Sequence, residues 1–402
     1  MGANLLALRS HNTALVLDLL RTAGTDGISR LELADRTGLT PQAVSKITAR
    51  LRDSGLAAEA GRRASTGGKP RTVLRLVPGA GHAVGVHLDR DELRVVLVDL
   101  TGAVVGERRA PLDLGAGAGV VVEAVAREVE GLVGGADEDS VVREAERRVG
   151  GPAVQEETAP AEAAVASPVT QGAPPPPPAP ARNLLGVGVA LPGPLDHAHG
   201  ILHRVTGFPE WDGFPLRDAL ARRLGVPVVV DKDTNAAALG LAVAGEGGSF
   251  AYLHLGTGLG AGLVIGGGVH RGARTGAGEF GHQVIQLDGP PCDCGNRGCI
   301  EALCLAAVAR GDLDEAARVL GTGAGNLVGL LDIDLVLLGG RTVAADPEPF
   351  VRGVAAVLDA RARREGAREA AVPVRVAPGG ARGVAEGAAQ LLLGPLFGRA
   401  DG

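Results

Sequence analysis

Residues 29–51 read SRLELADRTGLTPQAVSKITARL, and this stretch decides the fold of the N-terminal part of the chain. Ser29 and Glu32 have the spacing of a capping box, in which the two residues satisfy each other's free backbone N–H groups at a helix start. Thr40 and Pro41 predict the start of a second helix, because threonine caps helices and proline suits the first helical position. Two short helices around a glycine-containing turn predict a helix-turn-helix.

The second of these helices has an apolar side and a polar side. Val44, Ile47 and Leu51 recur at three- and four-residue spacing and predict a buried stripe. The side chains expected to remain exposed are those of Gln42, Ser45, Lys46 and Arg50. In a helix-turn-helix the second helix enters the major groove of DNA, so we expect these four residues and Thr40 to contact DNA.

A glycine-rich basic hairpin follows these helices. Residues 66–71 read TGGKPR and precede a strand-like stretch at 72–77, which predicts the wing of a winged helix. Glycine removes side-chain obstruction, while Lys69 and Arg71 can neutralise phosphate charge. A helical hairpin that packs on a partner is the alternative. The capped helices, the exposed helix face and the basic wing follow one another in the sequence, and together they indicate that residues 1–77 form a DNA-binding domain.

The charge distribution separates this domain from the rest of the chain. Residues 1–76 hold twelve Lys and Arg against six Asp and Glu, a net charge of +6. The whole chain carries −6, which leaves −12 for the remainder. A basic head on an acidic body indicates that the head meets a polyanion. A solvated charged face is the alternative.

The composition indicates a soluble chain of more than one domain. At 402 residues the chain is too long for one ordinary compact domain. It has no apolar run of about 18 residues and its first ten residues lack a signal pattern, so we expect a cytoplasmic protein without a membrane span. Four cysteines, three of them within eight residues, favour a metal site over disulfides in that reducing compartment.

From residue 82 onward the pattern changes to alternating strands and helices. Strands are expected at 83–88, 93–100, 184–191, 226–230, 251–255, 334–338 and 372–376, and helices at 120–132, 216–224, 235–243 and 382–393. This alternation predicts an α/β fold for residues 78–402. Residues 134–182 are acidic and rich in Ala and Pro, so we expect a disordered insertion there. A proline-rich docking ligand is the alternative for that segment.

The strongest chemical signal is a group of cysteines close to a histidine. Cys292, Cys294 and Cys299 with His282 offer three thiolates and one imidazole, which complete a tetrahedral structural zinc site. Zinc would fix a loop that core packing cannot hold. A set of free cysteines is the alternative, and Cys304 lies outside the pattern and is expected in the core.

A glycine-rich loop directly follows the strand expected at 251–255. It contains Gly256, Thr257 and Gly258. Glycines at this position let backbone N–H groups approach a phosphate, or simply make a tight turn.

Polar residues at two further places predict a ligand site. Asp233 and Asn235 follow the strand expected at 226–230, at the carboxyl end where α/β sheets place ligands. Glu279 and Glu301 flank the cysteine loop, and carboxylates accept hydrogen bonds from neighbouring hydroxyl groups. We expect Asp233 and Asn235 to lie at a ligand site and His282 and Glu301 to face a polyol; solvated acids are the alternative for Glu279 and Glu301.

Together these stretches resemble the ROK family (repressors, open reading frames and kinases), and specifically its winged-helix transcription regulators. Residues 278–282, GEFGH, and 292–301, CDCGNRGCIE, resemble the family's sugar-contact and zinc signature, with His282 serving both. Residues 229–239 resemble the segment that bears the catalytic aspartate of family kinases, and Asp233 matches it. Residues 256–258 resemble the family's second phosphate loop. The Gly-Gly at the end of residues 335–340 resembles the glycine pair on the adenosine side of the family's nucleotide site.

The resemblance implies a fold and a function. The fold would be a winged helix-turn-helix followed by a two-lobed, actin-like sugar-kinase domain of the ribonuclease H-like class. The function would be that of a sequence-specific transcription regulator, a repressor of carbohydrate genes that senses a sugar or sugar phosphate. Its partners would be operator DNA, a structural zinc ion and further copies of the chain in a homodimer or homotetramer.

The first phosphate loop departs from that of family kinases, which read Asp-x-Gly-Gly-Thr. Here residues 85–91 read GVHLDRD, so that His87 replaces the aspartate while Asp89 and Arg90 replace the glycines. Carboxylates repel a triphosphate, and the side chains that replace the glycines keep the backbone N–H groups from approaching it. We therefore expect no enzyme activity and only a vestigial role for Asp233.

Two other functions are alternatives to a sugar-sensing regulator. The first is an ATP-dependent, glucokinase-like sugar kinase with Asp233 as the base that takes a proton from the sugar. The second is a regulator that has lost its effector. Two departures from the family pattern support this alternative. Lys232 stands where the family usually has a sugar-binding Asn, and the Asn that usually lies ahead of the tryptophan, here Trp211, is missing.

Overall fold

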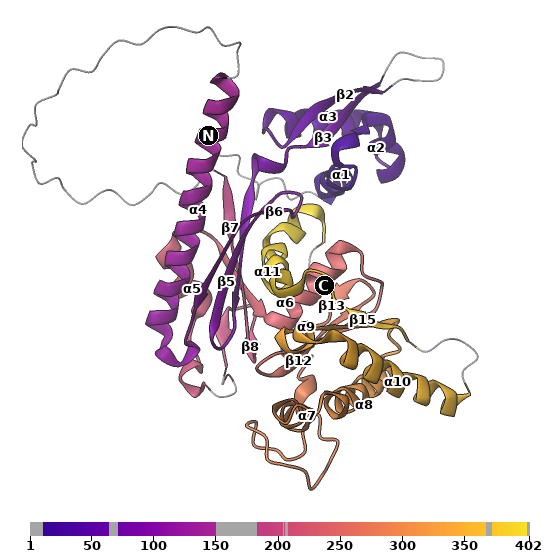
Figure 1. Cartoon of the computed structure of the whole chain (residues 1–402). Coiled ribbons are helices and arrows are strands. Elements are labelled where there is room, and N and C mark those ends of the chain that lie inside the picture. Colours follow the sequence, from indigo (N-terminus) through magenta and orange to yellow (C-terminus); the bar gives the residue numbers. More distant parts are fainter. Residues whose placement is uncertain are drawn as a thin grey trace, which may run out of the picture.

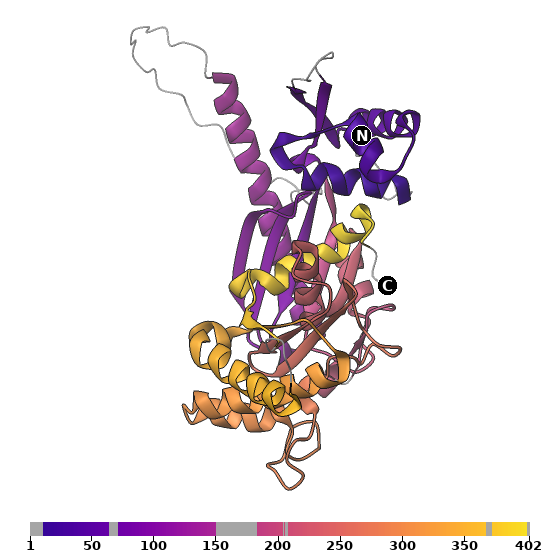
Figure 2. The same ribbon diagram turned by 90° about the vertical axis from the view of Figure 1, so that its right-hand side faces the viewer.

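In the computed structural model a small N-terminal domain and two lobes follow one another along the molecule (Figures 1 and 2). The structure describes residues 11–63, 71–149, 183–203, 205, 208–366 and 372–399. The expected wing tip with Lys69 and the larger part of the expected insertion lie outside these ranges. None of the described helices is long and apolar enough to cross a membrane.

The N-terminal domain is a winged helix-turn-helix. Its helices are α1 (His11–Thr22), α2 (Arg30–Thr37) and α3 (Pro41–Asp53), and its strands are β1 (Ile28–Ser29), β2 (Ala57–Arg63) and β3 (Arg71–Leu76). The predicted capping box is confirmed: the Glu32 N–H donates to Ser29 Oγ (3.3 Å) and the Ser29 N–H to Glu32 Oε2 (2.8 Å). Thr40 caps α3 by accepting from the Ala43 N–H at 3.2 Å. The antiparallel β2 and β3 form the wing, with β1 on the far side of β3.

The first lobe is built on a five-stranded sheet. The strands lie in the order β10-β7-β4-β5-β6, in which β10, β7 and β4 are parallel and β4, β5 and β6 antiparallel. Their bounds are β4 (His82–Leu88), β5 (Glu92–Asp99), β6 (Val104–Pro111), β7 (Leu184–Leu191) and β10 (Val228–Lys232). Helices α4 (Ala118–Val149) and α5 (Leu216–Leu224) cover one face, where Val121 and Leu216 join Val84 in one apolar cluster.

The second lobe repeats this plan. Its sheet has the order β13-β12-β11-β14-β15, with strands β11 (Phe250–Leu255), β12 (Leu259–Ile265), β13 (Gly268–Val269), β14 (Leu335–Gly339) and β15 (Val374–Val376). Helices α7 (Ile300–Ala309), α8 (Leu313–Leu331) and α10 (Pro347–Glu365) pack on one face of it. The short helix α9 (Arg341–Ala345) directly follows β14. These two sheets with their helices confirm the predicted α/β fold.

Two helices, α6 (Asp233–Ala244) and α11 (Gly383–Leu393), pack against each other between the two sheets. Helix α11 lies very close to the first sheet: a Cβ on Gly85 would be 1.9 Å from Ala385 O, and one on Gly188 1.9 Å from Ala388 O. Only glycine at these two positions leaves room for the helix backbone.

One apolar cluster joins the N-terminal domain to the first lobe and α11. Leu17 and Leu20 of α1 belong to the same cluster as Val96 of β5, Leu393 of α11 and Phe397 just after it. The guanidinium of Arg21 lies over the Phe397 ring at 5.1 Å. Because these side chains share one core, α1 and α11 belong to the same packed unit.

Several predicted boundaries differ from the observed ones, and two of the differences concern the insertion and the site. The insertion was expected from residue 134, but α4 continues to Val149. Residues 136–149 contain Ala, Glu and Arg, which are strong helix formers, and they extend a helix that has already nucleated. The helix expected from residue 235 already begins at Asp233, because Lys232 has the extended conformation of an N-cap and an acidic residue is stabilised in the first turn.

Candidate functional site

The exposed face of α3 carries the predicted DNA contacts. Gln42, Ser45 and Lys46 are exposed, while Val44, Ile47 and Leu51 are buried as the spacing predicted. Arg50 is also exposed, but its Nη2 donates to Thr13 Oγ1 on α1 (3.3 Å), so part of its guanidinium is used within the domain. Arg71 is exposed at the start of β3. The structure therefore brings Gln42, Ser45 and Lys46 together on one open surface.

The predicted metal ligands converge. The side-chain ligand atoms of His282, Cys292, Cys294 and Cys299 all lie within 4.8 Å of one another. Cys292 Sγ lies 3.7 Å from His282 Nδ1, and Cys294 Sγ lies 3.7 Å from Cys299 Sγ. A tetrahedral ion with metal–ligand bonds of about 2.0–2.3 Å requires its ligands to be roughly 3.3–3.8 Å apart. These two separations match that requirement, and the donor set is one that could hold a single tetrahedral metal ion.

Four of the five residues predicted to contact a ligand line one small pocket between the lobes. These are Asp233, Glu279, His282 and Glu301, and Thr257 and Gly258 of the glycine-rich loop lie in the same wall. The volume enclosed by the described residues is about 90 Å³. Asn235 does not line this pocket. It lies in the first turn of α6, where its Nδ2 donates to Asp231 Oδ1 at 2.9 Å.

Lys232 fills part of this pocket. Its side chain is only 4% exposed, and its Nζ donates to Glu279 Oε1 (3.0 Å) and to the backbone oxygen of Ala277. Glu301 is held as well, because its Oε2 accepts from the Leu259 N–H at 2.7 Å. Glu279 and Glu301 therefore each have one carboxylate oxygen already bonded, and a ligand must either use the other oxygens or displace Lys232.

A buried ion pair below the pocket was missed by the sequence analysis. Arg271 Nη2 lies 2.7 Å from Asp231 Oδ2, and both side chains are buried. Asp231 also accepts from Asn235, so this pair fixes the start of α6 that carries Asp233. The two residues are 40 positions apart and belong to no local motif, so the sequence offered no signal for the pair.

Asp233 has a strongly perturbed acidity. Burial raises its pKa to about 7, and the negative charges of Asp89 and Glu279 add to the effect. The carboxyl group is thus divided between its charged and neutral forms near neutral pH, which is the range that suits a general base.

We expect Asp233→Asn to stabilise the protein only at the higher pH values. Since the pKa is higher in the folded chain than in the unfolded chain, stability falls as the pH rises from about 4 through about 7. The amide removes this ionisation cost, so the free energy of unfolding should rise by on the order of 4 kcal/mol at pH 8 and remain nearly unchanged at pH 4. Urea denaturation at pH 4, 6 and 8 measures this. Asp218→Asn, at an exposed position on α5, is the control, and an equal effect of Asp233→Asn at all three pH values would contradict the prediction.

Residues 85–91, which resemble the first phosphate loop of family kinases, span the end of β4 and the tight turn into β5. Asp89 in this turn accepts a hydrogen bond from Thr257 Oγ1 (3.0 Å) in the second loop, so the two loops are joined directly. His87, at the end of β4, is buried, and burial together with the neighbouring His254 lowers its pKa to about 4. Its Nε2 has no hydrogen-bond partner among the described residues. Both histidines line a larger cavity of about 480 Å³ that runs along α6 and α11 as far as Arg21.

Models of known families match both parts of the chain. The model described as ROK family matches residues 176–309, and the one described as winged helix-turn-helix DNA-binding matches residues 16–57. Over 378 residues the chain is 26% identical to a putative xylose repressor of Caldicellulosiruptor sp. (strain Rt8B.4), which covers 83% of this chain and 84% of that protein.

Solved structures agree with these matches. The crystal structure of a ROK family transcriptional regulator, a homologue of the E. coli MLC protein, has a TM-score of 0.66 at 19% identity and covers 96% of this chain and 97% of that chain. At that identity it shows the fold. The ROK hexokinase from Thermus thermophilus has a TM-score of 0.53 at 28% identity and covers 77% and 96% of the two chains. The chain therefore combines a segment that matches the winged helix-turn-helix model with a later segment, residues 176–309, that matches the ROK family model.

Proposed function

We propose that this protein is a DNA-binding repressor of carbohydrate genes whose ROK domain senses a sugar or sugar phosphate. One observation carries the proposal. The polar face of α3 is exposed, and the domain that contains it packs in the same apolar cluster as α11. The DNA-binding class is supported by the winged helix-turn-helix match at residues 16–57. The effector class is supported by the similarity to a protein named as a xylose repressor.

The pocket of Asp233, Glu279, His282 and Glu301 would hold the effector. Carboxylates and an imidazole present the acceptors and donors that sugar hydroxyls need. Binding between the lobes would change their closure, and with it the position of α11 and of α1, which packs on the same core. An effector can shift this equilibrium only by its differential affinity for the two arrangements. The proposal includes a homodimer on a palindromic operator, since paired half-sites mirror two-fold symmetry.

The proposal also includes a structural zinc ion held by His282, Cys292, Cys294 and Cys299. Three thiolates and one imidazole leave no open coordination position, so the ion would hold the loop and take no part in a reaction. His282 and Glu301 lie beside this loop, and the ion would fix their direction toward the effector.

A sugar kinase is the second candidate, and the pKa of Asp233, raised to about 7, favours it. The first phosphate loop opposes it. Asp89 places a carboxylate against Thr257 of the second loop, where a phosphate would have to bind. A carboxylate at this place repels a triphosphate, so we propose that the ROK domain senses and does not phosphorylate.

Two assays on the purified full chain test this proposal. A gel shift with the region upstream of its own gene should give a retarded band that weakens as salt is raised. A coupled assay for ADP release across common hexoses should stay at background. No salt-sensitive shift, or sugar-dependent ADP release that Asp233→Asn abolishes, would contradict the proposal.

A further inference from the structure

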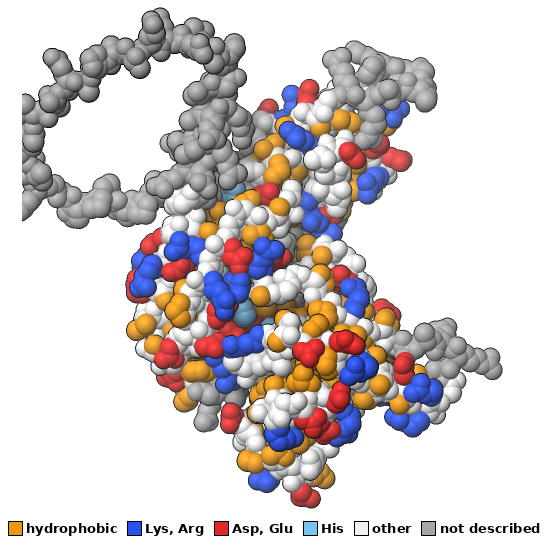
Figure 3. Space-filling view, viewed as in Figure 1, with side chains coloured by type: hydrophobic (Ala, Val, Ile, Leu, Met, Phe, Trp, Pro, Cys, Tyr) orange, Lys and Arg blue, Asp and Glu red, His pale blue; other side chains and the backbone are white. Residues whose placement is uncertain are grey.

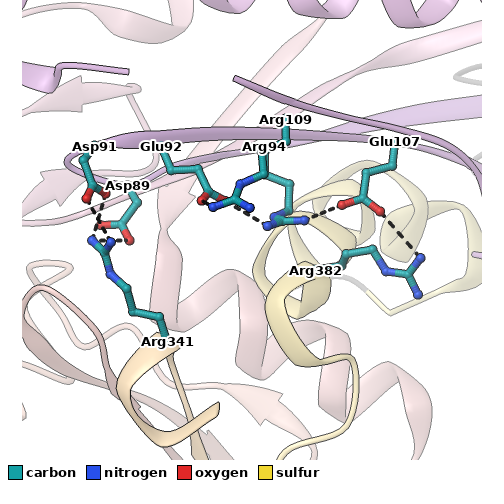
Figure 4. Close-up of polar contacts among 8 residues, drawn as sticks. All are labelled: Asp89, Asp91, Glu92, Arg94, Glu107, Arg109, Arg341 and Arg382. Atoms are coloured by element: carbon teal, nitrogen blue, oxygen red, sulfur yellow. Dashed lines mark hydrogen bonds and ion pairs between the residues drawn. The ribbon is translucent and has the colours of Figure 1, made fainter. Parts of the chain in front are cut away.

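Charged side chains from both lobes meet across the cleft beside the β4–β5 turn. Figure 4 shows Asp89, Asp91, Glu92 and Arg94 on or beside this turn, with Arg341 approaching them from the start of α9. The space-filling view shows acidic and basic side chains interleaved on the same face of the molecule (Figure 3). The cleft is thus crossed by ion pairs.

Arg341 makes the central contact. Its Nη1 lies 2.9 Å from Asp91 Oδ2 and its Nη2 lies 2.8 Å from Asp91 Oδ1, a two-point pairing of guanidinium and carboxylate. The same Nη2 lies 3.3 Å from Asp89 Oδ2. Since Asp89 Oδ1 accepts from Thr257 Oγ1, two side chains of the first lobe are bonded to two of the second.

A weaker contact lies further along the cleft. Arg382 Nη1 is 3.7 Å from Glu107 Oε2 on β6, just before α11 begins. Glu92 and Glu107 are also paired with Arg94 and Arg109 of the first lobe itself (Figure 4). These local pairs hold the two carboxylates in place, whereas Arg341 reaches across the cleft.

We propose that Asp89, Asp91 and Arg341 form a latch that holds the two lobes together without a bound ligand. The two carboxylates lie in the turn that resembles a phosphate loop. Their partners, Arg341 and Thr257, belong to the second lobe of the same chain. The chain thus supplies its own anions between the lobes. Arg341 also holds the pKa of Asp91 below its usual range, so the latch keeps its charges at neutral pH.

The exposure of the latch limits its strength. Asp91 is 61% exposed and Arg341 44%, whereas Asp89 is only 18% exposed. Exposed ion pairs contribute little because water and salt screen them. The latch therefore biases the lobes toward closure by a few-fold, a size that effector binding can overcome.

Hydrogen–deuterium exchange on the full chain tests the latch. In Arg341→Ala we expect exchange to rise about two- to five-fold both in the β4–β5 turn and in the turn from β14 into α9. Arg352→Ala is the matched control, because Arg352 is an exposed arginine of the same lobe that pairs only with Asp314 and Glu348 of that lobe among the ion pairs of the described residues. The control should leave both turns unchanged.

Two further variants separate a latch from general loosening. Arg341→Lys keeps the charge but loses the two-point geometry, so its exchange should lie between that of the wild type and that of Arg341→Ala. Asp91→Asn removes the carboxylate from the other side of the contact and should raise exchange in the same two turns. Exchange in Arg341→Ala equal to that of the control would overturn the proposal. So would a rise in the first-lobe turn alone, or unchanged exchange in Asp91→Asn. If Arg341→Ala does not fold, Asp91→Asn serves in its place with the same expected result.

Discussion

Replacing both Gln42 and Lys46 by alanine is expected to lower the affinity for operator DNA by about 100-fold. Both side chains are exposed on α3, on the side opposite the buried Val44 and Leu51. Each lost base contact costs about 1–3 kcal/mol, and a lost phosphate contact adds to this in a salt-dependent way. Two such contacts together correspond to roughly two orders of magnitude in the dissociation constant.

Fluorescence anisotropy with labelled operator DNA measures this loss. Lys46→Ala alone should also reduce the slope of log affinity against log salt by about one if Lys46 contacts a phosphate. The control is Arg318→Ala, which removes one positive charge from an exposed position on α8. An operator affinity of the double variant equal to that of the control would show that α3 is not the recognition helix.

Replacing Cys292 by serine is expected to release the metal and to lower the melting temperature by at least about 5 °C. Metal binding free energy at a structural site is folding free energy, because the ligands converge only in the folded chain. The loop that carries Cys292, Cys294 and Cys299 contains little apolar surface of its own, so packing cannot replace the ion. Losing several kcal/mol lowers the melting temperature by a few degrees per kcal/mol in a domain of this size.

Elemental analysis and thermal denaturation of the same samples measure both effects. The wild-type chain should carry about one zinc ion, and a chelator should lower its melting temperature to that of Cys292→Ser. Cys304→Ala is the control, since Cys304 is buried on α7 outside the cluster and the variant should keep its zinc. Wild-type protein without bound metal, or full zinc content in Cys292→Ser, would contradict the assignment.

Features that depend on neighbouring residues could be predicted from the sequence. The capping box at Ser29 and Glu32 and the buried stripe of α3 involve residues three or four positions apart, and the structure confirms both. The convergence of His282 with Cys292, Cys294 and Cys299 was also predictable, because thiolates and an imidazole at close spacing have few other uses. The grouping of Asp233, Glu279 and Glu301 followed from a resemblance to the ROK family.

Features that depend on distant contacts could not be predicted. Arg341 and Asp91 are 250 positions apart, and no local pattern links them. Asn235 follows Asp233 closely enough to suggest a shared pocket, yet the helix turns its amide toward Asp231. The sequence did single out Lys232, but its ion pair with Glu279 is visible only in the folded chain. Charged and polar side chains pair according to the fold, so their partners become known only when the fold is known.

The most direct test of the proposed function measures whether this chain binds DNA sequence-specifically. It compares the affinity of the chain for a DNA fragment from upstream of its own gene with its affinity for random DNA of equal length. At physiological salt a sequence-specific regulator should bind the upstream fragment at least about 1,000-fold more tightly. Equal affinity for the two fragments, with phosphorylation of a hexose at ordinary enzymatic rates by the same preparation, would show that the ROK domain is a kinase and that the N-terminal domain does not read an operator.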